Sequence, residues 1–353
     1  LVSNDLMKQN ILIIAYEKPL TTVDIAKAIG IPMPYIEHAI EDLVKSELMC
    51  RVGNKVFTDF LIVTPEMILK GLDAQISLAE NNYDSIWMCI KALFAEIKNL
   101  AWYTKLSDRE KVILEYYAML DVFSGGIHTT TKRIVDVTEE YPDRPDGGAW
   151  IAQGNRHPTN FDYSEYRFAK YCYAGERCVC WEKFLNSQSI DLHVYDTQPD
   201  LNKYEHGPVE IHDDNLCKLL YIIYQDIPFD AIGFNLMFAE DIPHLVECGV
   251  LQYENGKPKV VIPVISKEQF NELRKLIIKH MHVLANILEM PLRNIFPKLK
   301  YDIPKHLEGH IAELRQYSCY SIPMAVVKTA INNGDFLNNA DYPTPPMVLV
   351  INQ

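Results

Sequence analysis

Proline and glycine divide the first 64 residues into segments that leave room only for short helices and a hairpin. Pro19 ends a first apolar segment, because proline lacks the amide proton that a helix interior needs. Thr22 is a suitable N-cap for a second helix, and Gly30 ends that helix in a left-handed conformation. Pro34 suits the first turn of a third helix, which the apolar spacing carries to about residue 47. A β-hairpin is predicted around the turn Gly53-Asn54.

The third predicted helix has an apolar side and a polar side. Its inward positions are Ile36, Ile40, Leu43 and Val44. Its outward positions are Tyr35, Glu37, His38, Glu41, Asp42 and Lys45. Three helices followed by a hairpin are the layout of a winged helix-turn-helix, in which the third helix enters the major groove of DNA.

This layout predicts a DNA-contacting surface. We expect the start of the third helix to approach bases or phosphates, and the start of the second helix and the hairpin to touch the DNA backbone. The predicted contacts are Thr21, Thr22, Pro34, Tyr35, His38, Lys45, Arg51, Asn54 and Lys55. Half of the outward residues on the third helix are acids, which a polyanion repels. The alternative is therefore a winged helix that serves as a dimerisation or partner-docking module.

The stretch Asn10–Phe60 resembles winged helix-turn-helix transcription regulators, through Pro19–Ala26, Ile29–Pro32 and Tyr35–Leu48. It is particularly similar to a region found in poorly characterised sigma-factor-like proteins of Gram-positive bacteria. The segment Arg144–Ile151 is similar to the same group. The resemblance implies a winged-helix fold, a role in transcription, and DNA or RNA polymerase as partners.

A second copy of the pattern is predicted at residues 214–266. Leu216–Tyr224 has helical spacing, Ile242–Cys248 resembles the end of the third helix, and Asn255-Gly256 makes a turn. From Leu43 to the cap at Thr64 is 21 residues, and from Leu245 to the cap at Ser266 is the same 21. We interpret this as an internal repeat. The alternative is a chance match of two short units.

Helices are expected at about 65–80 and 82–101, and a third is expected to open at the capping box Ser107–Glu110 and to end at Ser124-Gly125-Gly126. Within the second of these, apolar residues recur at the spacing of a coiled coil. They are Tyr83, Ile86, Ile90, Leu93, Ile97 and Leu100. This stripe predicts either a core contact with neighbouring helices or a homodimer interface.

The segment after Gly126 favours strands. We expect them at Trp150–Gln153, Tyr166–Tyr173, Arg177–Phe184 and Ile190–Tyr195, with a hairpin turn at Ala174-Gly175-Glu176. The aromatics and cations gathered there favour a sheet core, with a small-ligand pocket as the alternative. They include Trp150, Tyr163, Tyr166, Tyr171, Tyr173, Trp181, Arg156, His157, Arg167 and Arg177.

The C-terminal part is predicted to be helical before a short apolar tail. Helices are expected at 267–290, 304–316 and 322–333, the last one ended by Gly334, and the tail is Met347–Ile351. Phe270, Leu273, Ile277 and Leu284 should face inward on the first of them.

Together these patterns predict a helix-rich α+β fold with an N-terminal winged helix-turn-helix, a central antiparallel sheet and a second winged-helix-like unit. The expected segments are a winged helix at 1–64, a helical segment at 65–125, a small antiparallel α+β domain at 126–212, and the second winged-helix-like unit with C-terminal helices at 213–353.

Composition limits the function classes. The net charge is −13, which disfavours broad non-specific binding to nucleic acid. Apolar runs are far shorter than the roughly 20 residues that cross a bilayer, so no membrane role is expected. The eight scattered cysteines favour a reducing cytoplasm, and no secretory leader is recognisable. The first residue is Leu1, which is compatible with a piece of a longer chain.

Neither metal nor cofactor is expected, and the chain is not expected to be an enzyme. Cys172, Cys178 and Cys180 with His193 lack the paired spacing of a zinc knuckle. His306 and His310 have the spacing of a zinc protease helix, but Leu307 stands where the general base would be. Phosphate-binding glycine loops and serine-hydrolase motifs do not occur.

The sequence therefore predicts a transcription regulator that binds DNA through its first winged helix, with a ligand-sensing or dimerising remainder. The alternative is a protein-interaction scaffold whose acidic winged helices dock a basic partner, such as part of the transcription machinery.

Overall fold

The computed structural model describes residues 5–134, 153–155, 173–184, 188–197, 214–228, 241–299, 303–310, 322–336 and 346–351. The fold is helix-rich α+β, as predicted. Contacts divide the chain into two compact units, each built from separate stretches of sequence. The first unit comprises Leu1–Ala74, Val135–Asp162 and Asn294–Cys319, and the second comprises Gln75–Ile134, Tyr163–Arg293 and Tyr320–Gln353.

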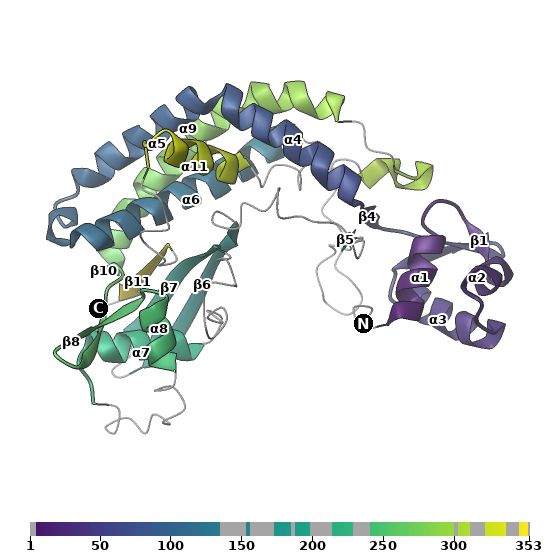
Figure 1. Ribbon diagram of the computed structural model, residues 1–353, viewed down its shortest axis with the longest axis horizontal. Helices are drawn as coiled ribbons and strands as arrows, with labels where there is room; N and C mark the ends of the chain where they lie inside the picture. The colour runs from purple at the N-terminus through teal and green to yellow at the C-terminus, as the bar shows by residue number, and fades with distance from the viewer. Residues whose placement is uncertain are drawn as a thin grey trace. The chain divides into compact units, whose positions relative to one another are not determined.

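The first unit opens with three helices and a small sheet (Figure 1). The helices are α1 (Leu6–Ile14), α2 (Thr22–Ile29) and α3 (Met33–Lys45). The strands β1 (Leu20–Thr21), β2 (Met49–Val52) and β3 (Lys55–Thr58) form one sheet in the order β1-β3-β2. β4 (Leu61–Val63) then pairs in parallel with β5 (Gln153–Asn155), and α4 (Pro65–Asn81) follows β4 in the chain. Short 3₁₀ helices lie at Phe296–Lys298 and Lys305–His310.

Local signals explain most of these boundaries. Gly30 adopts a φ of +75° at the end of α2, and Pro34 lies in the first turn of α3, both as predicted. The N-cap of α2 is Thr21, not Thr22, so the prediction was one residue late. The cap is Thr21 because its hydroxyl accepts the Asp24 amide while the Asp24 carboxylate accepts the Thr21 amide.

The second unit contains long helices that lie side by side (Figure 1). They are α5 (Tyr83–Lys98), α6 (Asp108–Ile134), α9 (Lys267–Ile295) and α11 (Ile322–Asn332), with a 3₁₀ turn at Tyr103–Lys105. The predicted stripe on α5 is buried from Tyr83 to Ile97, which makes it part of the core of this unit. The inward residues predicted on α9 are buried as well. The capping box at Ser107–Glu110 opens α6, as predicted.

A four-stranded sheet completes the second unit, in the order β10-β11-β7-β6. Its strands are β6 (Tyr173–Phe184), β7 (Gln188–Thr197), β10 (Val264–Ser266) and β11 (Met347–Ile351). β6, β7 and β11 pair antiparallel, whereas β10 joins β11 in parallel. Beside it lie α7 (Asp214–Tyr224), α8 (Asp241–Glu247) and the hairpin of β8 (Leu251–Glu254) and β9 (Lys257–Val260).

One strand prediction was wrong, and one strand was not predicted. Ala174-Gly175-Glu176 is not a hairpin turn but part of β6, where the pairing register with β7 shifts, and β6 pairs with β7 as far as Phe184 and Gln188. The apolar tail Met347–Ile351 is an inner strand of the sheet, and all five of its residues are buried. A continuous apolar run is expected for a strand that is covered on both faces.

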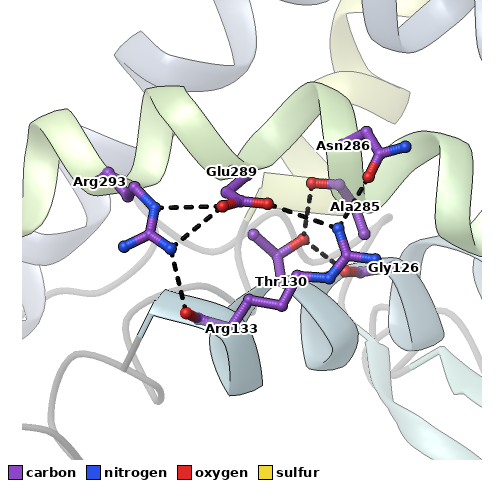
Figure 2. A network of polar contacts seen from close by, with 7 residues as sticks. All are labelled: Gly126, Thr130, Arg133, Ala285, Asn286, Glu289 and Arg293. Atoms are coloured by element: carbon purple, nitrogen blue, oxygen red, sulfur yellow. Dashed lines mark hydrogen bonds and ion pairs between the residues drawn. The ribbon is translucent and has the colours of Figure 1, made fainter. Parts of the chain in front are cut away.

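The predicted end of α6 at Gly125-Gly126 was also wrong, because the helix continues to Ile134. Both glycines face α9: a Cβ on Gly126 would lie 2.8 Å from Cδ2 of Leu284, and one on Gly125 would overlap Met281. The glycines therefore serve the close approach of two helices and not a turn. The polar contacts around them are drawn in Figure 2, where the Thr130 hydroxyl donates to the carbonyls of Gly126 and Ala285.

Arginines from both helices close the end of this contact (Figure 2). Arg133 on α6 donates to Asn286 at 2.8 Å and pairs with Glu289, and Arg293 on α9 also pairs with Glu289. Arg293 further donates to the Arg133 carbonyl at 3.1 Å. A cation at the carbonyl end of α6 is favoured by the helix dipole. The contact is thus apolar at the glycines and polar at its end.

The later part of the internal repeat predicted at 214–266 recurs in the backbone, at a constant offset of 202 residues between 39–67 and 241–269. After α3 the Leu48 amide donates to the Leu43 carbonyl at 2.9 Å, and after α8 the Val250 amide donates to the Leu245 carbonyl at the same 2.9 Å. Hydrogen bonds of this kind, from an amide to the carbonyl five residues earlier, end a helix in a Schellman motif. The residues at the left-handed position are Glu47 and Gly249.

The hairpins and the following caps repeat too. β2 pairs with β3 in the same register as β8 with β9, residue for residue at this offset. The hydroxyl of Thr64 accepts the amide of Met67, and that of Ser266 accepts the amide of Gln269, both at 3.3 Å. In each repeat the next strand, β4 or β10, pairs in parallel with a strand from elsewhere in the chain.

Replacing Gly126 by Ala tests the close helix contact. We expect the free energy of unfolding to fall by about 1–3 kcal/mol, because the methyl group would strike the fully buried Leu284. Chemical denaturation measures it. The control is Ser124→Ala on the same helix, which should change little. A stability gain for Gly126→Ala, as expected for Ala in an unobstructed helix, would contradict the close contact.

Candidate nucleic-acid interface

The residues predicted to contact DNA lie on α2, α3 and the hairpin of β2 and β3, all within the first unit. Thr21 and Thr22 are half-buried, and the other seven are exposed. We call this set the candidate DNA surface: Thr21, Thr22, Pro34, Tyr35, His38, Lys45, Arg51, Asn54 and Lys55.

Helix α3 places its apolar side in the core and its polar side in solvent. Ile36, Ile40 and Leu43 are almost completely buried, whereas Tyr35 keeps 65% of its surface exposed. Glu37, His38 and Glu41 are exposed on the same helix. The side of α3 available to a ligand therefore combines an aromatic ring, an imidazole and two carboxylates.

One acid of α3 is neutralised from within the fold. The ammonium group of Lys8 on α1 donates to the Asp42 carboxylate at 2.9 Å. This hydrogen bond is the main reason that the pKa of Asp42 lies below its ordinary value. Sequence reasoning missed the pair, because Lys8 and Asp42 lie on different helices and 34 positions apart. The pair lowers the negative charge that α3 presents.

The start of α2 is less available to a ligand than predicted. The Thr21 hydroxyl donates to the Asp24 carboxylate at 2.7 Å and accepts the Asp24 amide at 3.2 Å. The hydroxyl proton is thus used inside the capping box, and the exposed Asp24 carboxylate lies beside it. Hydrogen bonds from Thr21 lower the pKa of Asp24, which stays charged at neutral pH. Asp24 would repel a phosphate placed at Thr21.

The hairpin cations lie on opposite faces of the sheet. Residues paired directly across antiparallel strands share a face, and neighbours along a strand alternate. Arg51 pairs with Val56, whereas Lys55 pairs with Val52 in β2 and with Thr21 in β1. Arg51 is therefore on the face of the buried Val56, and Lys55 is on the other face.

Thr58 fixes the hairpin to the rest of the first unit. Its hydroxyl donates to the Leu12 carbonyl of α1 at 2.6 Å, and its amide donates to the Ala15 carbonyl at 3.1 Å. His306 completes the set, with Nε2 at 3.0 Å from the Thr58 carbonyl and its ring 4.8 Å from that of Phe57. The side chain of His306 therefore packs on the hairpin. Sequence alone gave no signal for this role.

The second repeat presents a different surface on the same backbone. At the positions of Lys45 and Arg51 it has Glu247 and Tyr253. Its hairpin lysines are paired: Lys257 with Asp226 at 3.1 Å and Lys259 with Glu254 at 2.7 Å. Among the residues that the structure describes, no salt bridge engages Lys45, Arg51 or Lys55 of the first repeat.

Metal-binding geometry is not found among the described residues, where no group of three or more His, Cys, Asp or Glu is placed to hold an ion. His193 stacks on Phe270 with ring centroids 4.3 Å apart. Cys172 and the side chains of Cys178 and Cys180 lie outside the described residues, as do those of the aromatic group predicted around the central sheet. In the described helices, none is long and apolar enough to cross a membrane.

One cluster has the composition of a nucleophilic triad. The Cys89 sulfur lies 3.7 Å from Nδ1 of the buried His280, and Nε2 of His280 lies 3.2 Å from Glu96. Burial raises the pKa of the Cys89 thiol to about 11, so the thiol is neutral at physiological pH. A neutral thiol is a poor nucleophile. The cluster ties α5 to α9, together with the ion pair of Lys279 and Glu96.

The chain matches no known family model, no curated protein and no solved structure.

Replacing Thr21 by Ala tests whether this residue caps α2 or contacts a ligand. Loss of the capping box should lower the free energy of unfolding by about 1 kcal/mol. The neighbouring Thr22→Ala, which removes no cap, should have a smaller effect. Thermal or urea denaturation of both variants decides. Equal stabilities of Thr21→Ala and the wild type would contradict the capping role.

Alkylation tests the state of Cys89. At pH 8 the native protein should take up iodoacetamide at Cys89 only slowly, because the thiol is buried and its pKa is near 11. Peptide mass spectrometry after timed quenching measures the rate, with the urea-unfolded protein as the fast control. Labelling of the native protein as fast as in urea would show an accessible Cys89 thiolate and would support a nucleophilic role for Cys89.

Proposed function

We propose that the first repeat with α1 and α2 is a winged helix that binds duplex DNA, and that the protein is a transcription regulator without enzymatic activity. The observation that carries the proposal is the contrast between the two repeats. Lys45 and Arg51 are exposed and outside any described salt bridge, whereas the second repeat has the acid Glu247 and the aromatic Tyr253 at these positions and pairs its hairpin lysines with acids. Unpaired cations can release counterions from DNA phosphates, and paired ones contribute less.

The aromatic and imidazole side chains of α3 add to this argument. Tyr35 and His38 lie near the start of the helix, which is the part of a recognition helix that approaches base edges. The phenol and imidazole can donate to phosphates or bases. Lys8 supports the same surface indirectly, because it neutralises Asp42.

A second candidate function rests on the remaining acids of α3. Glu37 and Glu41 are exposed and outside any described salt bridge, and residues 5–63 carry eight acids against six lysines and arginines. This surface would suit a basic protein partner, such as a component of the transcription machinery. In that case charge reversal of Glu41 to Lys would weaken partner binding, whereas the same change should strengthen DNA binding.

The proposal is tested with Lys45→Glu, which places the residue of the second repeat in the first. The full-length protein should bind a fluorescein-labelled random duplex in the range of about 10⁻⁴–10⁻⁶ M at physiological salt, and more tightly at lower salt. Lys45→Glu should weaken binding by roughly tenfold or more, since it removes a cation and adds an acid. Fluorescence anisotropy at several salt concentrations measures both effects.

The matched control is Lys275→Glu on α9, an exposed helix lysine of the second unit. It changes the net charge of the protein by the same amount, so it should leave DNA binding within about twofold if the surface around Lys45 is the binding site. Equal losses for the two variants would indicate a general charge effect. No binding by the wild type at low salt would refute the proposal.

A further inference from the structure

The hairpin of β2 and β3 carries two exposed cations, Arg51 and Lys55, that a charge count treats as equivalent. The strand register separates them. Arg51 shares a face with Met49 and Val56, and Lys55 shares the other face with Val52. A duplex resting on one side of this small sheet therefore meets one of the two side chains first.

The face of Arg51 is the one covered by the helices. Met49, Val56 and Thr58 on this face are buried, and Thr58 bonds to α1 through both its hydroxyl and its amide. Near the turn of the hairpin this face is no longer covered by the core, and Arg51 on it is exposed. Arg51 thus emerges on the side of the sheet that α1 covers. Because α1 packs against α3, we expect a duplex that touches α3 to lie on that side.

The surroundings of Lys55 argue in the opposite direction. Its partner across the sheet is Thr21, whose hydroxyl is bound to Asp24. Lys55 lies close enough to Asp24 for its positive charge to lower the pKa of the exposed Asp24 carboxyl. A phosphate approaching Lys55 would meet this carboxylate as well, which offsets part of the attraction.

We infer that Arg51, and not Lys55, is the phosphate-contacting cation of the hairpin, and that the DNA backbone crosses the helix-covered face of the sheet next to Arg51. The inference rests on the proposed DNA binding and deepens it. Arginine also suits this role chemically, because its planar guanidinium can hold a phosphate with two parallel hydrogen bonds.

The residue that replaces Arg51 in the test is taken from the matching position of the second repeat. Tyr253 occupies the position of Arg51 in the same hairpin register and is 56% exposed, so Arg51→Tyr removes the charge with a side chain that this backbone accepts. Lys55→Gln removes the other charge and keeps a long polar side chain. Circular dichroism melts of both variants test whether the fold is retained.

The experiment measures binding of the full-length protein to a labelled random duplex from 50 to 300 mM NaCl. Loss of one phosphate contact should lower the slope of log K against log salt by about 0.9 and weaken binding about eightfold at 0.1 M salt. Arg51→Tyr should show this loss, and Lys55→Gln should stay within about twofold of the wild type.

Each other result has a defined meaning. An equal or larger loss for Lys55→Gln overturns the inference, and so does wild-type affinity in both variants, since the hairpin would then not touch the backbone. In both cases the proposed function stands, because the wild type still binds. Absence of wild-type binding at 50 mM NaCl overturns the proposed function itself, and the inference with it.

Discussion

The attachment of Thr58 is the interaction on which the candidate DNA surface depends. This buried residue uses its hydroxyl and amide on α1 and its carbonyl on His306. Leaving any of these groups unpaired in the core would be costly, so these hydrogen bonds favour the observed register of the hairpin on the helices. A slip of one residue would exchange the two faces, moving Arg51 away from the helices and Lys55 toward them. Thr58 thus determines which cation a ligand meets.

The two repeats share their backbone features but differ in their exposed side chains. Both keep the helix closure, the hairpin register and the cap before the next helix, and both bury the residue at the Leu43 or Leu245 position. Their exposed positions have diverged in charge: the hairpin lysines of the second repeat are held by Asp226 and Glu254. A shared fold therefore does not argue for a shared function, and the binding argument applies to the first repeat alone.

Sequence reasoning succeeded where the cause was local. Gly30, Pro34 and the capping box at Ser107 act within one helical turn, and each was placed correctly from neighbouring residues. It failed at Gly125-Gly126 because the residues that make glycine necessary there, Met281 and Leu284 of α9, lie more than 150 residues later in the chain. The Lys8–Asp42 pair and the contact of His306 with the hairpin are invisible in sequence for the same reason. The opposite faces of Arg51 and Lys55, by contrast, follow from the alternation along strands once the turn at Gly53 is placed.

The net charge of −13 and the acids on α3 weigh less against DNA binding than they first suggest. Charges are screened over roughly 8–10 Å at physiological salt, so a phosphate at the hairpin responds to its immediate neighbours. There it meets Arg51 on one face and the Lys55–Asp24 neighbourhood on the other. Under the proposed DNA binding, the exposed acids Glu37 and Glu41 on α3 would oppose insertion of the middle of that helix more than contact at its start. In the proposed mode, contact led by the hairpin and by Tyr35 would allow an acidic protein to bind a polyanion.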